Sequence, residues 1–373
     1  MKYVAVFFGG VSQEHDVSVL TGVLTLNCLD KERYIGVPVY VDREGKWFTG
    51  DALGKVSFFK RYDEKKLVRV SVLCGEDALY AKKGGSFKKI CDVYCAINCL
   101  HGRNGEDGSL AGVMRMCKIP FASPDLFSAS ASMDKCKTKL FLNALGVKNV
   151  PFAEITKREF FTDSAYAIER VRAIFGYPAI VKPAKSGSSI GITVAKDDGG
   201  LIDALNKAFS YDESCVVERF LAGANDVNCA AFKKGAKILV SECERPLTRG
   251  EFLSFADKYT STKYGAQREF PAKIEKSASD EIKKITEKVY KAFGFCGIIR
   301  VDYLLYDGEI YLNEINSSPG SLAYYLFCDK FAEFSKILDD VIRQGVEERV
   351  SYDNCSFEFS SDILSFEGIS LKK

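Results

Sequence analysis

The sequence is poor in the residues that bind transition metals and in long apolar runs. Only two histidines, His15 and His101, occur among 373 residues, which excludes a histidine-rich metal site. Neither a P-loop nor a G-x-G-x-x-G pattern is present, so two common phosphate-binding fingerprints are missing. The longest apolar run near the start, residues 4–8, is too short for a membrane span or a signal-peptide core. We therefore expect a cytoplasmic protein without a membrane partner, and any metal would have oxygen ligands, as Mg²⁺ does.

Charge and cysteine content exclude further classes. The 52 basic and 50 acidic residues leave a net charge of +2, so no basic excess points to nucleic acid as a partner. In a chain without an export signal, the 13 cysteines are expected to be reduced thiols. Cys91, Cys95 and Cys99 are evenly spaced but form no C-x-x-C pair, and we interpret residues 92–100 as a buried strand. With 47% hydrophobic residues, the length predicts two or three domains.

The first third of the chain alternates strands with helices. Strand patterns lie at residues 4–8, 34–41 and 92–100, and helical patterns lie at residues 17–29 and 110–117. This alternation predicts a parallel sheet with helices on its faces. Residues 42–89 show no regular pattern and are interpreted as irregular and polar. Ser123-Pro124 is typical of a helix N-cap followed by the first helical residue.

The character of the sequence changes near residue 123. Helices are predicted at residues 134–145, 164–175, 201–209 and 277–293, the last opening with a Ser277-x-x-Asp280 capping box. Strands are predicted at residues 179–183, 190–195, 215–220, 227–232, 237–243, 300–306 and 309–316. Residues 244–272 exceed an ordinary loop, and loops of that length are often functional lids. We predict three domains, at residues 1–122, 123–214 and 215–373.

Residues 182–191, with the sequence KPAKSGSSIG, have the composition of a phosphate cradle. Glycines let the backbone approach an anion, successive N–H groups and hydroxyls donate to oxygens, and lysines supply positive charge. Because this segment joins two predicted strands, it would act as a flap over phosphates. A flexible hairpin turn explains the same composition equally well, so the segment alone leaves both interpretations open.

A second polar cluster lies in the last predicted hairpin. Arg300 and Asp302 fall in one apolar strand, and Glu314 and Asn316 fall in the other, where unpaired polar groups are costly. A three-residue turn at residues 306–308 would put all four side chains on one face, whereas a two-residue turn would separate Asp302 from Glu314. We therefore predict the three-residue turn and an oxygen ligand set suited to Mg²⁺. A salt-bridge ladder around Arg300 is the alternative.

Short motifs follow one another in a fixed order along most of the chain. They are residues 9–18 (GGVSQEHDVS), 100–108 (LHGRNGEDG), 132–135 (SMDK), 181–191 (VKPAKSGSSIG), 257–259 (DKY), 300–302 (RVD), 313–316 (NEIN) and 318–320 (SPG). Each motif alone is weak, but the ordered set resembles the D-alanine–D-alanine ligase family of the ATP-grasp superfamily. The resemblance implies α/β and α+β domains in an ATP-grasp architecture, with an N-terminal Rossmann-like domain built on a parallel sheet.

The resemblance also implies a nucleotide site that binds ATP with two Mg²⁺ or Mn²⁺ ions. Lys135, Lys182 and Lys258 resemble phosphate-contacting lysines, and Ser189 lies in the flap. Glu218 resembles the acid that meets the adenine amino group, and Leu221 resembles the adjacent backbone hinge. Asn225 stands where the family usually has a glutamate near the ribose. The residues that match the family's metal ligands are Asp302, Glu314 and Asn316.

By the same resemblance, a D-alanine carboxylate attacks the γ-phosphate to give an acyl phosphate and ADP. The amine of a second D-amino acid then displaces phosphate. Glu14 resembles the residue that holds the first ammonium, linked to Ser188 and Tyr259, and His101 lies near the first carboxylate. Arg300 and the Gly320 N–H resemble the donors to the oxyanion. The acceptor carboxylate would meet Tyr325 and Leu326, with Tyr325 in place of the family's serine.

Other readings of the same motifs stay open. A D-alanine–D-serine ligase, or another ATP-grasp carboxylate–amine ligase, would use the same scaffold. Tyr259 favours an amide product, because members that use lactate carry histidine at that position. A nucleotide-binding regulator with an impaired site belongs to a different class, and the intact motifs argue against it. The family resemblance further suggests a homodimer.

Overall fold

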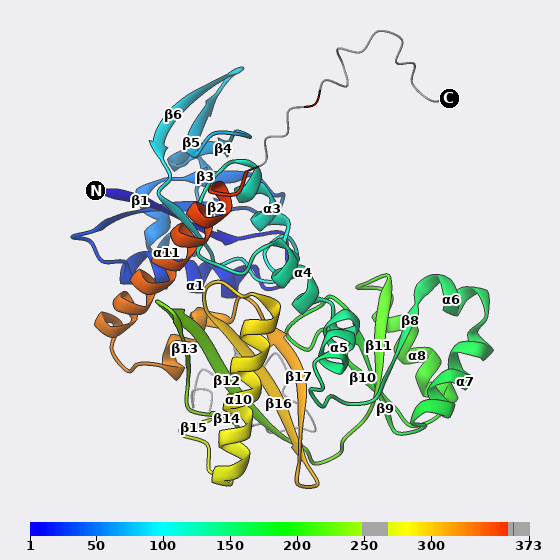
Figure 1. Ribbon diagram of the computed structural model, residues 1–373. Helices are drawn as coiled ribbons and strands as arrows, with labels where there is room; N and C mark the ends of the chain where they lie inside the picture. The colour runs from blue at the N-terminus through cyan, green and yellow to red at the C-terminus, as the bar shows by residue number, and fades with distance from the viewer. Residues whose placement is uncertain (248–267, 357–360, 362–373) are drawn as a thin grey trace.

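An apolar strand near the start of the chain organises the first sheet. β1 (Lys2–Gly9) pairs in parallel with β2 (Tyr34–Val41) and with β7 (Cys95–Asn98). The structure is a computed structural model that describes residues 1–247, 268–356 and 361, and it places this sheet at the top of Figure 1. The predicted Lys258 and Tyr259, and the DKY motif that contains them, lie outside the described residues.

The predicted parallel pairing is confirmed for β1, β2 and β7, and antiparallel strands extend one edge of this sheet. The sheet order is β6-β5-β4-β3-β2-β1-β7, and every pairing from β2 to β6 is antiparallel. The added strands are β3 (Trp47–Thr49), β4 (Val68–Val72), β5 (Ala78–Lys83) and β6 (Ser86–Asp92). They occupy the segment interpreted as irregular. β3 is short and β6 is exposed at all but one position, so these two strands carry little apolar pattern. β4 (VRVSV) does alternate apolar and polar residues, and the first four residues of β5 are buried.

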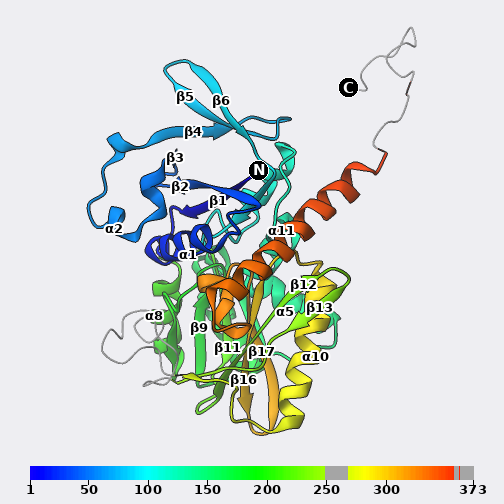
Figure 2. The ribbon, with the colours of Figure 1, turned by 90° about the vertical axis from the view of Figure 1, so that its left-hand side faces the viewer.

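Helices from both ends of the chain cover the first sheet. α1 (His15–Cys28) and α3 (Ser109–Met116) follow β1 and β7 in sequence, while α11 (Phe331–Asp353) returns from the far end of the chain. Phe334, Leu338 and Ile342 of α11 share a buried core with β1, β7 and α1 (Figure 2). Three short helices lie in the insert after β3, namely η1 (Asp51–Gly54), α2 (Val56–Phe59) and η2 (Glu64–Lys66).

A four-stranded antiparallel sheet follows, in the order β10-β9-β11-β8. Its strands are β8 (Phe152–Thr156), β9 (Ala179–Pro183), β10 (Thr193–Ala195) and β11 (Ser214–Arg219). Three helices pack with it around one core, namely α6 (Lys157–Thr162), α7 (Ser164–Ile174) and α8 (Asp198–Ala208). This sheet lies on the right in Figure 1, and the predicted phosphate flap is the connection from β9 to β10.

Two helices precede this sheet, α4 (Leu126–Met133) and α5 (Lys135–Ala144). The predicted N-cap at Ser123 is wrong, because Asp125 caps α4 by accepting a 2.8 Å hydrogen bond from the Ser128 N–H. The Ser123 hydroxyl instead accepts from the Asn98 N–H at the end of β7, at 3.0 Å. A backbone N–H at a distant strand end therefore decides how Ser123 is used, which no local pattern reveals.

The third sheet is antiparallel in the order β13-β12-β16-β17. Its strands are β12 (Asn225–Lys234), β13 (Lys237–Val240), β16 (Ile299–Tyr306) and β17 (Glu309–Asn316). α10 (Lys276–Phe293) packs on this sheet, and it ends at Gly294 as expected. The predicted Ser277–Asp280 capping box is wrong, because the helix begins at Lys276 and its N-cap Glu275 makes no side-chain cap. β14 (Arg245–Pro246), β15 (Arg268–Glu269) and η3 (Gly320–Leu326) complete the described elements.

The last hairpin has a shorter turn than predicted, but Asp302 and Glu314 still share one face. Tyr306 pairs with Glu309, so the turn has two residues, Asp307 and Gly308, both at positive φ (52° and 75°). The register then shifts between Asp302 and Tyr303, which brings Asp302 opposite Glu314. The extra residue that the parity argument required is therefore a β-bulge within the strand pair. The carboxylates share one face by a different route from the one predicted.

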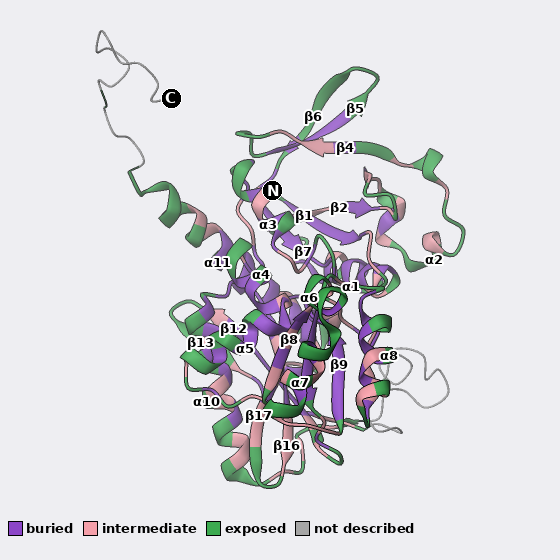
Figure 3. Ribbon diagram, turned by 90° about the vertical axis from the view of Figure 1, so that its right-hand side faces the viewer, coloured by how far each residue is buried: buried purple, intermediate pink, exposed green. Residues whose placement is uncertain are grey.

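Burial follows the three sheets. Buried residues concentrate in the sheets and in the helix faces against them, while most of β6, the tip of the β5–β6 hairpin and the far end of α11 are exposed (Figure 3). Within the described ranges, no helix is long and apolar enough to cross a membrane. The same part of the chain contains no group of three or more His, Cys, Asp or Glu side chains that could hold a metal ion. The three evenly spaced cysteines, Cys91, Cys95 and Cys99, are buried free thiols.

Candidate active site

A cavity between the second and third sheets collects most of the predicted nucleotide site. Residues of β9, the flap and β11 face residues of β12, β16 and β17 across it. Of the predicted site residues, those that line this cavity are Lys135, Lys182, Ser189, Glu218, Leu221, Asp302 and Glu314. Side chains that lie more than 170 positions apart in the sequence thus share one enclosure.

A buried carboxylate between two lysines forms the floor of this cavity. The Lys182 ammonium lies 2.7 Å from one oxygen of Glu218, and the Lys139 ammonium lies 2.8 Å from the other. Burial alone would raise the pKa of Glu218, but the two ammonium groups outweigh it and lower this pKa to about 2. Lys139 is fully buried, and desolvation lowers its pKa. The sequence reasoning missed Lys139, although its place four residues after Lys135 puts both on one face of α5.

Lys135 connects the flap to the predicted metal ligands. Its ammonium donates to the carbonyl oxygen of Ser186 at 2.6 Å and lies 3.8 Å from a Glu314 oxygen. In the flap itself, Ser188 and Ser189 both have positive φ (51° and 59°), a conformation that turns the chain sharply. The Lys135 ammonium therefore places a positive charge beside the flap and next to Glu314.

The four polar residues of the last hairpin do meet on one face. The Arg300 guanidinium makes a bidentate contact with Asp302, at 2.7 and 2.8 Å, and the Asn316 amide donates to Asp302 at 3.0 Å. Arg300 stands opposite Asn316 in the register, and Asp302 stands opposite Glu314. Two carboxylates and an amide so placed fit a hard divalent cation such as Mg²⁺ or Mn²⁺. The alternative ion pair with Arg300 is also present, in the same cluster.

Glu14 and Ser188 join the first sheet to the flap. Glu14 is the residue immediately before α1, and its carboxylate accepts a hydrogen bond from the Ser188 hydroxyl. A Cβ atom at Gly187 would lie only 2.8 Å from a Glu14 oxygen, so glycine permits this close approach. His101 is buried beside α1, where its ring nitrogen lies 3.1 Å from the Thr21 hydroxyl. Burial lowers the pKa of His101, which favours the neutral ring.

Glu106 is a second residue that the sequence reasoning did not single out, although it belongs to a quoted motif. Its carboxylate accepts from the Gly102 N–H at 2.8 Å and from the Ser318 N–H at 3.1 Å. Burial, and after it the nearby charge of Glu14, raises the pKa of Glu106 to about 7. Glu106 thus ties the loop after β7 to the segment just before Gly320.

The predicted acceptor residues lie in η3, beside Arg300. The Arg300 guanidinium donates to the Tyr325 hydroxyl at 3.4 Å, and Arg268 covers the Tyr325 ring with its guanidinium carbon 4.9 Å from the ring centroid. Burial raises the pKa of Tyr325. The Leu326 side chain is 2% exposed and belongs to the core shared with α1 and α11. Tyr325 therefore faces the site, whereas the Leu326 side chain packs away from solvent.

Among the described residues of the predicted nucleotide site, Asn316 does not line the cavity between the second and third sheets, and neither does Asn225. Its side-chain oxygen accepts from Arg245 at 2.6 Å, and the residue is exposed at the start of β12. The following residue, Asp226, lines the cavity instead. Strand alternation explains the difference, since neighbouring side chains point to opposite faces.

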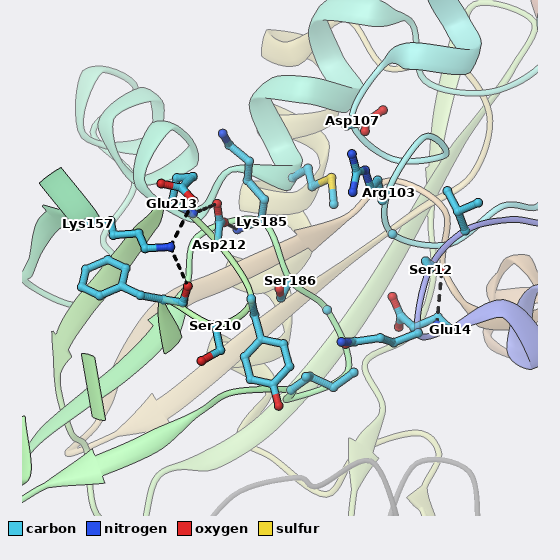
Figure 4. A pocket seen from close by; sticks show the side chains of 18 residues that line it. Ser12, Glu14, Arg103, Asp107, Lys157, Lys185, Ser186, Ser210, Asp212 and Glu213 are labelled. Carbon is cyan, nitrogen blue, oxygen red and sulfur yellow. Dashed lines mark hydrogen bonds and ion pairs between the residues drawn. The ribbon is translucent and has the colours of Figure 1, made fainter. Parts of the chain in front are cut away.

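A larger cavity of about 610 Å³ lies on the other side of the flap. Glu14 and Ser12 stand at one end of it, and Lys157, Asp212 and Glu213 stand at the other (Figure 4). Glu14 lines this larger cavity, and the flap residues Ser186 and Gly187 line both cavities. A small zwitterion could reach Glu14 through this larger cavity.

An antiparallel sheet with a flap, facing another antiparallel sheet across one cavity, defines the ATP-grasp class of enzymes. The family model "D-ala D-ala ligase N-terminus" matches residues 3–124, and "D-ala D-ala ligase C-terminus" matches residues 141–345. The chain therefore belongs to the D-alanine–D-alanine ligase family.

Individual relatives agree with this. A D-alanine–D-alanine ligase of Thermosipho melanesiensis is 34% identical over 353 residues, which cover 93% of this chain and 94% of the relative. The crystal structure of the D-alanine–D-alanine ligase from Helicobacter pylori has a TM-score of 0.75 at 28% identity, over 92% of this chain and 98% of that one. VanG, a D-Ala:D-Ser ligase from Enterococcus faecalis, has a TM-score of 0.77 at 26% identity, over 92% and 99%.

Proposed function

We propose that this chain uses ATP to join two D-alanines into D-alanyl-D-alanine through an acyl phosphate, for the synthesis of peptidoglycan precursors. The observation that carries the proposal is the register of the last hairpin. It sets Asp302, Glu314, Asn316 and Arg300 on one face, and that face lies across one cavity from Lys182. Family membership supplies the reaction, and this arrangement supplies the charges that the reaction needs.

The first step brings a carboxylate to a polyphosphate, two groups that repel each other. Lys135, Lys182 and Arg300 lie around the cavity and would neutralise the charge that gathers on the transferred phosphoryl group. Asp302, Glu314 and Asn316 would hold two Mg²⁺ or Mn²⁺ ions, which add positive charge at the phosphates when bound. The carboxylate oxygen bonds to the γ-phosphorus, the bond to the β-bridging oxygen breaks, and ADP leaves.

The second step forms the amide. The amine of the second amino acid attacks the acyl carbon, an oxyanion develops on the carbonyl oxygen, and phosphate leaves with the former C–O bond electrons. Arg300 and the backbone N–H of Gly320 are the proposed donors to the oxyanion. Arg300 lies on β16, which pairs with β17, and Gly320 lies in the segment that follows β17. The attacking nitrogen must lose a proton for the amide to form.

The binding of the first D-alanine is proposed at Glu14. Its carboxylate can pair with the ammonium of the substrate, and its hydrogen bond with Ser188 ties that contact to the flap. By family resemblance His101 lies near the substrate carboxylate, and burial, which lowers its pKa, favours a neutral ring that adds no charge there. Tyr259 and Lys258, from the lid-length segment, complete the proposed contacts by family resemblance.

Tyr325 favours a second candidate for the acceptor. A phenol fills the position where the family has a serine, and its hydroxyl contacts Arg300. D-serine, the acceptor named for the neighbour VanG, is therefore the alternative second substrate. Tyr325→Ser is expected to change the ratio of D-alanine to D-serine incorporated, measured by competition. An unchanged ratio and an unchanged acceptor KM would remove Tyr325 from the acceptor site.

Product analysis tests the reaction itself. The protein is incubated with ATP, Mg²⁺ and D-alanine, with D-serine, D-lactate or glycine as competitors, and the products are identified by mass. We expect D-alanyl-D-alanine and one phosphate per dipeptide. Lys182→Met should abolish turnover, while Lys137→Met is the control, because the Lys137 side chain is 50% exposed, pairs with Glu154 and lines neither cavity. Phosphate release without a dipeptide would contradict the proposal, and no ATP use at all would favour a nucleotide-binding regulator.

We further propose a cytoplasmic homodimer with domains at residues 1–122, 123–214 and 215–373. The first sheet falls within residues 1–122 and the third within residues 215–373, which supports these two ranges, whereas β11 of the second sheet runs from Ser214 to Arg219 and so extends past residue 214. Leu20 on α1 is 52% exposed and offers apolar surface for a partner copy. The molecular mass in solution tests the dimer, and a mass equal to one chain would contradict it.

A further inference from the structure

The loop that carries Gly320 has an unfavourable backbone. After Gly320, three consecutive residues, Ser321, Leu322 and Ala323, have positive φ values of 54°, 50° and 48°. The left-handed region is disfavoured for residues with a Cβ atom, so a run of three needs neighbours that hold it. At the start of this loop, the Leu322 N–H donates to the Pro319 carbonyl at 2.8 Å.

Thr21 of α1, which lies early in the chain, stabilises this loop through a hydrogen bond. Its side chain is buried, and its hydroxyl accepts a hydrogen bond from the Ser321 N–H at 3.0 Å. The same hydroxyl lies 3.1 Å from the ring nitrogen of His101. One side chain therefore touches both the loop next to Gly320 and the histidine beside the first amino-acid site.

His101 and Glu106 hold the other side of Gly320. His101 also hydrogen-bonds the backbone of Ser318, and the Ser318 N–H donates to Glu106 at 3.1 Å. Gly320 thus lies between two fixed points, Ser318 and Ser321, that both depend on residues of the first 110 positions. The orientation of the Gly320 N–H is therefore only as precise as the positions of Ser318 and Ser321.

We propose that Thr21 is a positioning residue, whose hydroxyl fixes the Ser321 backbone and so aims the neighbouring Gly320 N–H. It does not touch the reacting atoms. This inference rests on the proposed ligase reaction, because Gly320 acts as an oxyanion donor only there. It assigns the N-terminal helix a part in the amide-forming step, in addition to carrying Glu14 at its start.

Two readouts test it in the full-length protein. Thr21→Val removes the hydroxyl at nearly constant size, and Thr21→Ser restores it. Thr25→Val is the matched control, because Thr25 is a fully buried threonine one turn along α1 whose hydroxyl bonds the Thr21 carbonyl at 2.9 Å. Hydrogen–deuterium exchange of residues 319–326 reports the hold on the loop without any turnover. Steady-state kinetics reports its effect on the reaction.

For Thr21→Val we expect exchange at Ser321 to rise about tenfold or more, and kcat to fall about ten- to a hundredfold with the KM for ATP unchanged. Thr21→Ser should behave like wild type, and Thr25→Val should change neither quantity. Wild-type exchange in Thr21→Val, or an equal loss of kcat in Thr25→Val, would overturn the inference. Thr21→Ala replaces Thr21→Val if the latter does not fold. If the wild-type chain makes no dipeptide, the proposed reaction fails, and the exchange measurement alone decides whether Thr21 holds the loop.

Discussion

Replacing Lys139 with methionine tests the buried charge cluster beneath the nucleotide cavity. The Lys139 side chain is 1% exposed, and its ammonium lies 2.8 Å from Glu218, which is itself 2% exposed. Removing one partner of a buried ion pair costs about 3–5 kcal/mol, because the remaining charge is left without compensation. Lys182 still lies 2.7 Å from Glu218 in the variant, so the expected loss is at the lower end, about 3 kcal/mol.

The assay is urea unfolding of the whole chain with Lys137→Met as the control. Lys137 lies on the same helix, also pairs with a glutamate (2.7 Å to Glu154), and has a side chain that is 50% exposed. Exposed pairs contribute about 0–1 kcal/mol, so the control should lose no more than that. Equal losses in the two variants would refute the reasoning that burial makes the Lys139–Glu218 pair indispensable.

The pH dependence of the same variant adds an independent check. Glu218 has a pKa lowered from 4.5 to about 2 in the folded chain, so its ionisation stabilises the fold above pH 4.5. That contribution is lost as the pH falls from 4.5 toward 2. Without Lys139 the pKa of Glu218 is lowered less, and the unfolding free energy of Lys139→Met should fall less steeply over this range than that of the wild type.

Three further predictions concern the site. Arg300→Ala should reduce kcat about 10²- to 10³-fold, the loss typical of an oxyanion donor, while ATP still binds by calorimetry; near-normal turnover would reject Arg300 as a donor. The pKa of Glu106 is raised to about 7 in the folded chain, so ionisation of this carboxyl opposes folding. The free energy of unfolding of the wild type should therefore fall between pH 4.5 and 7 relative to that of Glu106→Gln. Parallel pH profiles of the two unfolding free energies would contradict this. Gly187→Ala places a Cβ atom 2.8 Å from the flexible end of Glu14. The variant should raise the KM for D-alanine about tenfold but leave the KM for ATP unchanged. An unchanged KM for D-alanine would show that Glu14 does not bind D-alanine.

Elements with a strong local pattern could be predicted from the sequence. The apolar runs of β1, β2 and β9 and the periodic α5, α7 and α10 are seen within a few residues of the expected bounds. The strands β3 and β6 could not be predicted, because β3 has only three residues and β6 is exposed at all but one position. The alternating VRVSV of β4 and the apolar start of β5 were signals that could have been found. The capping residues of α4 and α10 were also misjudged, since Ser123 and Ser277 have several possible partners and only the folded chain selects one.

The sequence by itself determined which kinds of side chain the site would contain. Ordered motifs supplied the lysines, the carboxylates and the flap, because such chemistry depends on residue type and short spacing. The tertiary structure alone decided how they meet. A β-bulge, and not the turn, aligned Asp302 with Glu314; Lys139 was buried against Glu218; and Thr21 reached Ser321 across 300 positions. Contacts between segments so far apart depend on packing and register, which no local pattern encodes.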